Sequence, residues 1–565
     1  MTEEAPPVTG PGARPNPADR AESPDGPARA EHAERRRARA ARYAGLAGAV
    51  LLAVAGYLGG ALPSAPLLRV TPVTIWQGRH GPLVLGAWLV GTALLVGAWW
   101  ALRAGAPSTG WTYRTAGLWA LPLLVTAPLG SRDVYSYACQ GWAYAHGVDP
   151  YVTGVAEAGC PWVDAVSPIW RDTPAPYGPV FVLLAALAVT VGGGLTGTIV
   201  LLRLFALAGV LLAALCLPGL ARAAGVPTRR AAWLLLACPL VGVHLLAGAH
   251  NDAVMLGLLL LGLLVLVRLP GRPGALLVAG ALLGLAVAVK ATAVVVIPYA
   301  ALAAVHGRYT VRALARDGGW LAGGVLAALA GSSLLSGLGL GWVGGLSHSG
   351  DSEQWTSPPT AVGFVVDYTG ALLGREPDSV PVARAVALLL LAALLVALWW
   401  WAWTALRRLN DARQRVARLA AARPRVALYA AGLALAATVV LAPVFHPWYA
   451  TWPLALLVVG AGGGHSADPA GNGPRRAVPS MPNVPVPADG PAPAGWRPYL
   501  ASRTTWFVLP CAAAAFLTLP DGTNLARFTK APGAITMTAL ILTLLGLTLS
   551  LLVRRLRQHP PPSPR

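Results

Sequence analysis

The chain has 565 residues, of which 55% are hydrophobic and only 12% are charged. Soluble domains carry about a quarter charged residues, so this composition excludes an ordinary soluble protein and predicts that most of the chain lies in lipid. Lys290 and Lys530 are the only lysines, so the formal net charge of +20 is almost wholly arginine, and the positive-inside bias of membrane proteins accounts for it without a nucleic-acid partner.

Residues 1–41 are rich in Pro, Ala, Glu and Arg and show no apolar period. We expect them to form a disordered basic tail. The tail ends in "ERRRARAARY", directly before the first apolar segment. Arginines in this position predict a cytoplasmic anchor.

Apolar runs long enough for a helix to cross a hydrocarbon core of ~30 Å recur along the chain. We expect 275–305 to form two short helices that meet at Lys290, and 448–463 to form a short span. The other runs lie near 42–62, 82–103, 113–130, 198–222, 231–249, 252–269, 318–340, 383–405, 426–444, 504–519 and 532–553. The sequence therefore predicts an all-α polytopic membrane protein with about 14 transmembrane helices and both termini cytoplasmic.

The apolar stretch 177–193 decides the sides of all later loops. If it crossed the membrane, six arginine-rich loops would lie outside, against the positive-inside bias. If it lies along or dips into the outer leaflet, all six are cytoplasmic. We therefore expect it to stay on the outer side.

This topology predicts a transmembrane core at 42–463 that carries the candidate site. Two large outer loops, 131–197 and 341–382, interrupt the core. A flexible cytoplasmic linker at 464–500, a transmembrane hairpin at 501–555 and a cytoplasmic tail at 556–565 follow. Cys139 and Cys160 share the first outer loop, where a disulfide between them could form but is not required.

Ionisable groups at a membrane edge are costly and are by default candidate functional residues. Several are expected at the outer face, although caps, snorkelling and interface aromatics offer structural alternatives for each. The candidates are Arg132, Asp133, Gln140, Arg203, His250, Asn251, Asp252, Lys290, His446, Trp448 and Tyr449. They place a carboxylate opposite cations, beside aromatic stacking surfaces.

Sugar transfer from a lipid phosphate suits these residue types. The acceptor hydroxyl needs a base, and the departing phosphate needs cations rather than a general acid. A glycoside hydrolase would need two carboxylates flanking the bond, and no close second partner is evident. The sequence also lacks a GxxxxGK[ST] loop and an HExxH helix.

Six stretches resemble one family in order as well as in content. They are "SRDVYSYACQGWAYAHGVDPY", "PAPYGPVF", "GAHNDAVMLGLLLLGL", "AVKATAVVVIPYA", "SPPTAVGFVVDYTG" and "FHPWYATWPL". Across about 40–460 the chain resembles the actinobacterial polyprenol-phosphate-mannose-dependent α-1,6-mannosyltransferases, membrane glycosyltransferases of the GT-C fold.

The resemblance implies an inverting transfer of mannose from polyprenyl-phosphate-mannose to the 6-hydroxyl of a lipid-anchored mannoside, outside the cytoplasmic membrane. It implies membrane-lying helices in the first outer loop and a catalytic base at Asp133. We expect Lys290, Arg203, Arg132 and His250 to bind the donor phosphate. We expect Asp252, Asn251, His446, Trp448, Tyr449 and Gln140 to bind sugar.

No metal ligand and no cofactor are assigned. Val134 after Asp133 leaves no DxD-like pair, so a requirement for a divalent metal stays open. Two alternatives remain at this level. One is a flippase for lipid-linked sugars, although no internal repeat supports it. The other is a transferase of the same fold that uses another sugar or a protein acceptor.

Overall fold

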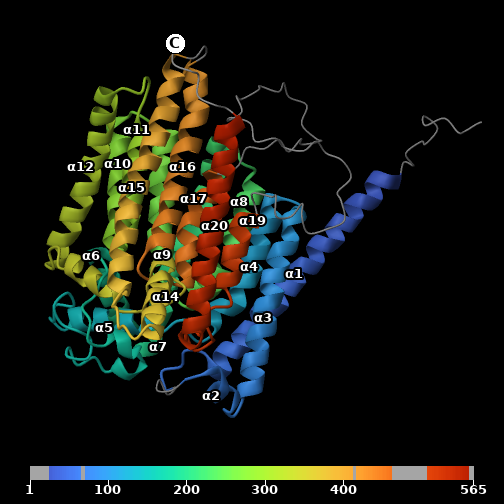
Figure 1. Ribbon diagram of the computed structural model, residues 1–565, viewed down its shortest axis with the longest axis vertical. Coiled ribbons are helices and arrows are strands. Elements are labelled where there is room, and N and C mark those ends of the chain that lie inside the picture. Colours follow the sequence, from blue (N-terminus) through green and yellow to red (C-terminus); the bar gives the residue numbers. More distant parts are fainter. Residues whose placement is uncertain (1–24, 65–69, 412–414, 461–504, 559–565) are drawn as a thin grey trace, which may run out of the picture.

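The computed structural model describes residues 25–64, 70–411, 415–460 and 505–558. These residues form an all-helical bundle whose helices run roughly parallel, with short helices and loops gathered at one end (Figure 1). The only extended pairing in the described residues is one isolated bridge, between Thr518 and Asn524. The expected 464–500 linker lies outside the described residues.

Seven helices in the described part of the chain are long and apolar enough to cross a membrane. They lie in α1 (Asp25–Gly59), α3 (Gly81–Ala101), α7 (Leu195–Ala224), α12 (Val311–Ser336), α15 (Val380–Arg407), α16 (Arg415–Leu441) and α20 (Lys530–Gln558). A bent pair, α8 (Thr228–Leu236) with a π-helix at Val241–Ala247, would make eight. The protein is thus a multi-pass membrane protein, and the count of about 14 crossings stays a prediction.

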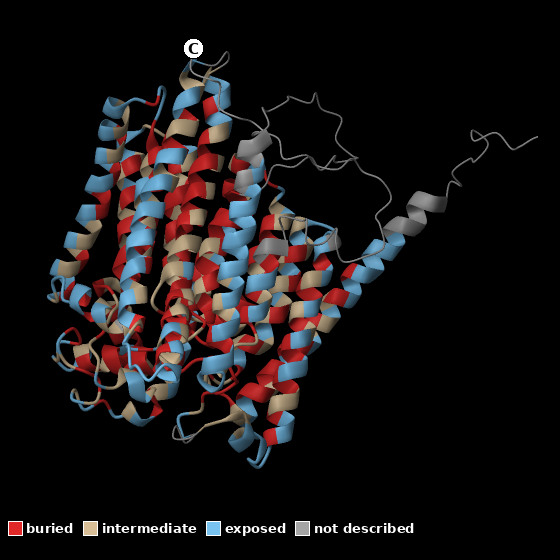
Figure 2. Cartoon of the chain, viewed as in Figure 1, coloured by how far each residue is buried: buried red, intermediate tan, exposed pale blue. Residues whose placement is uncertain are grey.

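Shorter helices complete the bundle. These are α4 (Thr109–Val125), α9 (Asp252–Arg268), α10 (Pro273–Val289), α11 (Ile297–Ala304), α17 (Thr451–Gly460) and α19 (Thr505–Ala514). Short helices outside the bundle are α2 (Pro72–Trp76), α5 (Asp133–Ala145), α6 (Pro179–Gly192), α13 (Trp342–Gly345) and α14 (Pro358–Leu372). Figure 2 shows buried residues concentrated between the helices and exposed residues on the outer surfaces, where apolar side chains face lipid.

Helix α1 begins earlier than the sequence predicted. It starts at Asp25, so the part of the expected disordered tail from residue 25 to 41 is helical. The reason is composition, because Ala, Arg and Glu are strong helix formers and continue the helix that the apolar segment requires. At the other end of the chain, α20 likewise continues to Gln558, into the expected cytoplasmic tail.

Helix α6 connects the region of Lys290 to the start of α7. Its first turn lies against the end of α10, where a Cβ on Gly178 would come within 2.3 Å of the Ala288 carbonyl oxygen. Its last residue, Gly192, lies against Thr198 near the start of α7. With 14 residues α6 is about 21 Å long, shorter than the hydrocarbon core of ~30 Å. This length is compatible with the expected arrangement in which 177–193 does not cross, and that arrangement stays a prediction.

The apolar run 275–305 is broken at Lys290, as its sequence predicted. Lys290 has an extended backbone, with φ −150° and ψ 122°, between α10 and a 3-10 helix at Ala291–Val296. The break places Lys290 between two helical segments, where the residue is buried.

Candidate active site

Helix α5 carries Asp133 at its first position. The Asp133 backbone N–H donates to Ser131 Oγ at 3.1 Å, and the Tyr135 hydroxyl donates to the Ala61 carbonyl beyond the end of α1. A disulfide joins Cys139 in α5 to Cys160 in the following loop. These ties fix the position of the aspartate relative to the bundle.

The turn of the C-terminal hairpin also packs on this segment. The Gly130 backbone N–H donates to the Pro520 carbonyl at 3.0 Å, and Gly522, at φ +93°, lies against Ser131 so closely that a Cβ would come within 2.9 Å of Ser131 Cα. The hairpin thus helps position the start of α5.

Four side chains from three segments form a charged cluster, which we call the Asp133–Lys290 cluster: Asp133, His250, Asp252 and Lys290. Lys290 Nζ donates to Asp252 Oδ2 at 2.9 Å. His250 Nδ1 lies 3.8 Å from Asp133 Oδ2 and 3.9 Å from Asp252 Oδ2. The Asp252 side chain is fully buried, whereas the Asp133 side chain is 18% exposed. Asp133 is therefore the carboxylate that a substrate can reach.

Asp252 is the close second carboxylate that the sequence did not reveal. Its Oδ1 accepts the Trp452 indole N–H at 2.5 Å and its Oδ2 accepts Lys290. Both oxygens therefore already accept a hydrogen bond. Asp252 serves as the counter-ion of Lys290.

Aromatic rings surround the cluster. The Lys290 ammonium lies 5.9 Å from the Tyr177 ring, 5.2 Å from Tyr449 and 5.3 Å from Trp452. Trp448 lies 4.0 Å from the His250 ring centroid and stacks on His446 at 4.6 Å. Such rings suit both cations and sugar faces.

Burial shifts the pKa values of Asp133, His250 and His446. It raises the pKa of Asp133 to about 6, and the nearby Lys290 only partly opposes this shift. Burial and Lys290 lower the pKa of His446 to about 3, and burial holds the pKa of His250 well below its ordinary value. Both histidines are therefore neutral at pH 7. Asp133 is ionised there but still basic enough to accept a proton.

Asn251 and Gln140 are buried polar residues near the cluster in sequence. Asn251 lies between His250 and Asp252, and Gln140 belongs to the same helix as Asp133. Both amide atoms of Asn251 and the Gln140 Oε1 have no hydrogen-bond partner among the described residues. Gln140 follows Asp133 and Tyr137 at helical spacing, so the three lie along one face of α5. Buried unpaired amides cost about 1–3 kcal/mol each, which a hydroxyl-rich ligand would recover.

The two arginines lie differently from the sequence expectation. Arg132 donates to the Ala165 carbonyl at 3.2 Å, which directs it toward the loop that follows α5. Arg203 donates to the carbonyls of Leu124 and Thr126 at the end of α4 and to that of Ala247 in the π-helix, at 2.8–2.9 Å. These bonds favour a structural role for Arg203 over a phosphate contact.

We expect Arg203→Ala to destabilise the protein by on the order of 3 kcal/mol, because three carbonyls lose a charged donor. The apparent KM for the lipid donor should stay unchanged in the folded fraction. Thermal unfolding in detergent and steady-state kinetics measure the two effects. Arg222→Ala, an exposed arginine on the same helix, is the matched control. A raised donor KM at wild-type stability would instead return Arg203 to the binding site.

Sequence reasoning missed Tyr137, Tyr177, Trp452 and His244. The Tyr137 hydroxyl lies 3.4 Å from His250 Nδ1, and His244 is fully buried with its ring 5.4 Å from Trp448. Tyr177 and Trp452 stand in "PAPYGPVF" and "FHPWYATWPL", two of the motifs that carry the family resemblance, so both could have been included as candidates. His244, inside an apolar run, was an ionisable group in a span and carried the same signal as Lys290.

A family model and several known relatives indicate the same family. A family model described as alpha-(1->6)-mannopyranosyltransferase, N-terminal domain, matches residues 42–306. The chain is 32% identical to alpha-(1->6)-mannopyranosyltransferase A of Mycobacterium tuberculosis, over 73% of this chain and 78% of that protein. It is 31% identical to a probable alpha-(1->6)-mannopyranosyltransferase of Mycolicibacterium smegmatis, over 73% and 77%.

A more distant relative, alpha-(1->6)-mannopyranosyltransferase B of Corynebacterium glutamicum, is 29% identical over 73% of this chain and 71% of its own length. No solved structure matches the chain.

Proposed function

The chain belongs to the alpha-(1->6)-mannopyranosyltransferase family and is a membrane mannosyltransferase, and from this premise we propose that its donor is polyprenyl-phosphate-mannose. We propose further that the acceptor is the 6-hydroxyl of a mannose on a lipid-anchored glycan, and that the product extends an α-1,6-mannan backbone. The observation that carries the proposal is the Asp133–Lys290 cluster, in which an accessible carboxylate lies beside a buried, counter-ion-fixed lysine.

The reaction needs one base and one cation. The oxygen of the acceptor hydroxyl attacks the anomeric carbon while Asp133 takes the hydroxyl proton. The bond from the anomeric carbon to the phosphate oxygen breaks. The phosphate leaves as a stable anion and needs no proton. Lys290 retains donor capacity beyond its bond to Asp252 and neutralises the leaving group. Attack opposite the leaving phosphate inverts the anomeric centre.

The remaining polar groups are suited to binding and orientation. Asn251 and Gln140 offer unpaired amide atoms to sugar hydroxyls, and Trp448, His446 and Tyr449 offer stacking faces. His250 Nδ1 lies 3.8 and 3.9 Å from the two carboxylates, and the neutral ring adds no charge between them. Arg132 lies next to the base and adds positive potential at the start of α5.

We propose that this site faces the exterior of the cytoplasmic membrane and that both termini are cytoplasmic. Two features support this orientation. The Cys139–Cys160 disulfide ties α5 to its loop, and disulfides persist in oxidising compartments. The arginine-rich loops of the sequence then all lie on the opposite side, in accord with the positive-inside bias.

The test is a transfer assay with the full-length chain in membranes, labelled polyprenyl-phosphate-mannose and a short α-mannoside acceptor. We expect labelled product whose new linkage is sensitive to an α-1,6-specific mannosidase. Dolichol- and polyprenyl-phosphate-linked glucose serve as donor controls. Movement of donor across the bilayer without product, or transfer from a nucleotide sugar alone, would contradict the proposal.

The rate should depend on pH through Asp133. Because the base is active only when ionised and burial raises its pKa to about 6, kcat/KM should rise as the pH rises through about 6 and then level off. At pH 5 only about a tenth of the carboxyl is ionised. The measurement is kcat/KM from pH 5 to 8, with unfolding monitored in the same buffers. A flat profile over that range would remove Asp133 as the titrating base.

A further inference from the structure

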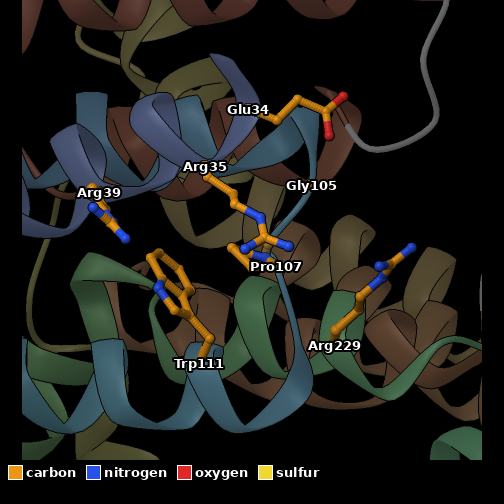
Figure 3. Close-up of a pocket in the computed structure, with 8 residues that line it drawn as sticks. Glu34, Arg35, Arg39, Gly105, Pro107, Trp111 and Arg229 are labelled. Carbon is orange, nitrogen blue, oxygen red and sulfur yellow. The ribbon is translucent and has the colours of Figure 1, made fainter. Parts of the chain in front are cut away.

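A basic pocket lies between the start of α1, the loop before α4 and the start of α8 (Figure 3). Its volume is about 490 Å³, and its lining includes Arg35, Arg39, Arg229, Glu34 and Trp111. Figure 3 shows the arginines of α1 extending toward Pro107 and Trp111, and Arg229 extending from the opposite wall. Two segments distant in sequence, α1 and α8, thus bring cations to one pocket.

The pocket lies at the end of the bundle opposite the candidate active site. Helix α4 starts at the pocket, and its far end is marked by the Arg203 bonds to Leu124 and Thr126. Its 17 residues are about 25 Å long, close to the hydrocarbon thickness of a bilayer. The membrane-spanning parts of α1 and α3 reach the same end. The pocket is therefore at headgroup level, in the leaflet away from Asp133.

Its electrostatics favour an anion. Three arginines face one glutamate, a net lining charge of +2 from three positive and one negative side chains. Helices α4 and α8 both begin here, and neither has an acidic residue in its first turn. The first turn of α8 instead contains Arg229 and Arg230, although cations are disfavoured at a helix N-terminus. An anion in the pocket would offset this unfavourable placement.

One wall of the pocket is held in place. The Arg42 guanidinium lies 4.1 Å from the Trp111 ring centroid and donates to the Trp111 carbonyl at 3.1 Å and to Thr115 Oγ1 at 2.8 Å. Trp111 is thus fixed before any ligand arrives. Tryptophan is common at the level of lipid headgroups, and guanidinium groups bind phosphate in bidentate geometry.

From these observations we propose that the pocket binds a phosphate-bearing anion at the membrane surface opposite the active site. The chemistry is that of a phosphodiester or phosphomonoester held by Arg35, Arg39 and Arg229. A phospholipid headgroup and a soluble phosphate ester share this chemistry, and the headgroup level of the pocket favours the lipid. Binding there would stabilise the packing of α1 on α4 and of α4 on α8, a role separate from sugar transfer.

The test uses the purified full-length chain in a neutral detergent. Thermal unfolding is followed while phosphatidylglycerol, phosphatidylcholine or glycerol phosphate is added. We expect phosphatidylglycerol to raise the unfolding midpoint in a saturable way, and phosphatidylcholine not to. Arg35→Glu with Arg229→Glu should weaken the apparent affinity at least tenfold. Arg312→Glu, an exposed arginine at the start of α12, is the control and should keep it.

The added ligands also distinguish a phospholipid headgroup from a soluble phosphate ester. A shift with phosphatidylglycerol alone identifies a lipid headgroup, and an equal shift with glycerol phosphate identifies a soluble ester. If the reversed pair does not fold, Arg35→Gln with Arg229→Gln supplies the same comparison. Two results would overturn the proposal. One is an equal rise of the unfolding midpoint with phosphatidylglycerol and phosphatidylcholine. The other is an unchanged response to phosphatidylglycerol in the Glu or Gln double variant of Arg35 and Arg229.

Discussion

Asp133→Asn is expected to lower the rate of mannosyl transfer by roughly 10³-fold, within the range that a positioned general base contributes. Asparagine has nearly the same shape and keeps an oxygen at the start of α5, so the fold should be preserved. What it loses is the ability to take the acceptor proton. The neutral His250, 3.8 Å away, offers little replacement because burial holds its pKa so low.

The matched control is Asp164→Asn. Asp164 belongs to the same loop, its side chain is 96% exposed, and it lies 3.7 Å from Arg171 at the surface. We expect this variant to keep its turnover and its unfolding midpoint. Initial rates with saturating donor and acceptor, together with thermal unfolding, separate loss of chemistry from loss of fold. Turnover within about twofold of the unmodified chain in Asp133→Asn would remove the base assignment.

Lys290→Met is the second large effect, and it should act on both stability and activity. The change leaves Asp252 fully buried without its cation, and an uncompensated buried charge costs about 3–5 kcal/mol. It also removes the group proposed to neutralise the departing phosphate. We therefore expect a lower unfolding midpoint and almost no transfer.

A second variant separates the two roles of this lysine. Lys290→Met combined with Asp252→Asn removes both charges and keeps an acceptor for Trp452, so most of the stability should return. Transfer should stay lost. The control is Lys530→Met, at the chain's other lysine. Lys530 is exposed and its Nζ lies 5.1 Å from the Phe364 ring centroid, so this variant should leave transfer intact. Recovery of transfer in the double variant would exclude Lys290 from the phosphate step.

Helix α6 shows what the distribution of charged residues can predict about topology when hydropathy cannot. Hydropathy could not tell whether 177–193 spans, because 17 apolar residues suffice for either arrangement. The distribution of arginines favours the arrangement without a crossing, and the 14 residues of α6 are fewer than a transmembrane helix needs. A constraint on the whole sequence thus gives a prediction where the local sequence gives none.

The role of Arg203 could not be predicted from its residue type and its depth in the membrane. Arg203 had the residue type and depth of a phosphate ligand, but its guanidinium is engaged by three carbonyls from two other segments. Those carbonyls are exposed to it because α4 ends at Val125 and the π-helix ends at Ala247. No pattern within α7 contains that information.

The sequence by itself determined the membrane class, the apolar segments and the helix break at Lys290, because hydrophobicity and charge act locally along the chain. It also carried the family, through motifs in a fixed order. Only the tertiary structure decided that Asp252 neutralises Lys290, that Arg203 ties α4 to the π-helix, and that the C-terminal turn packs on Ser131. Those outcomes depend on distances of a few ångströms between segments up to several hundred residues apart, which packing sets and periodicity cannot encode.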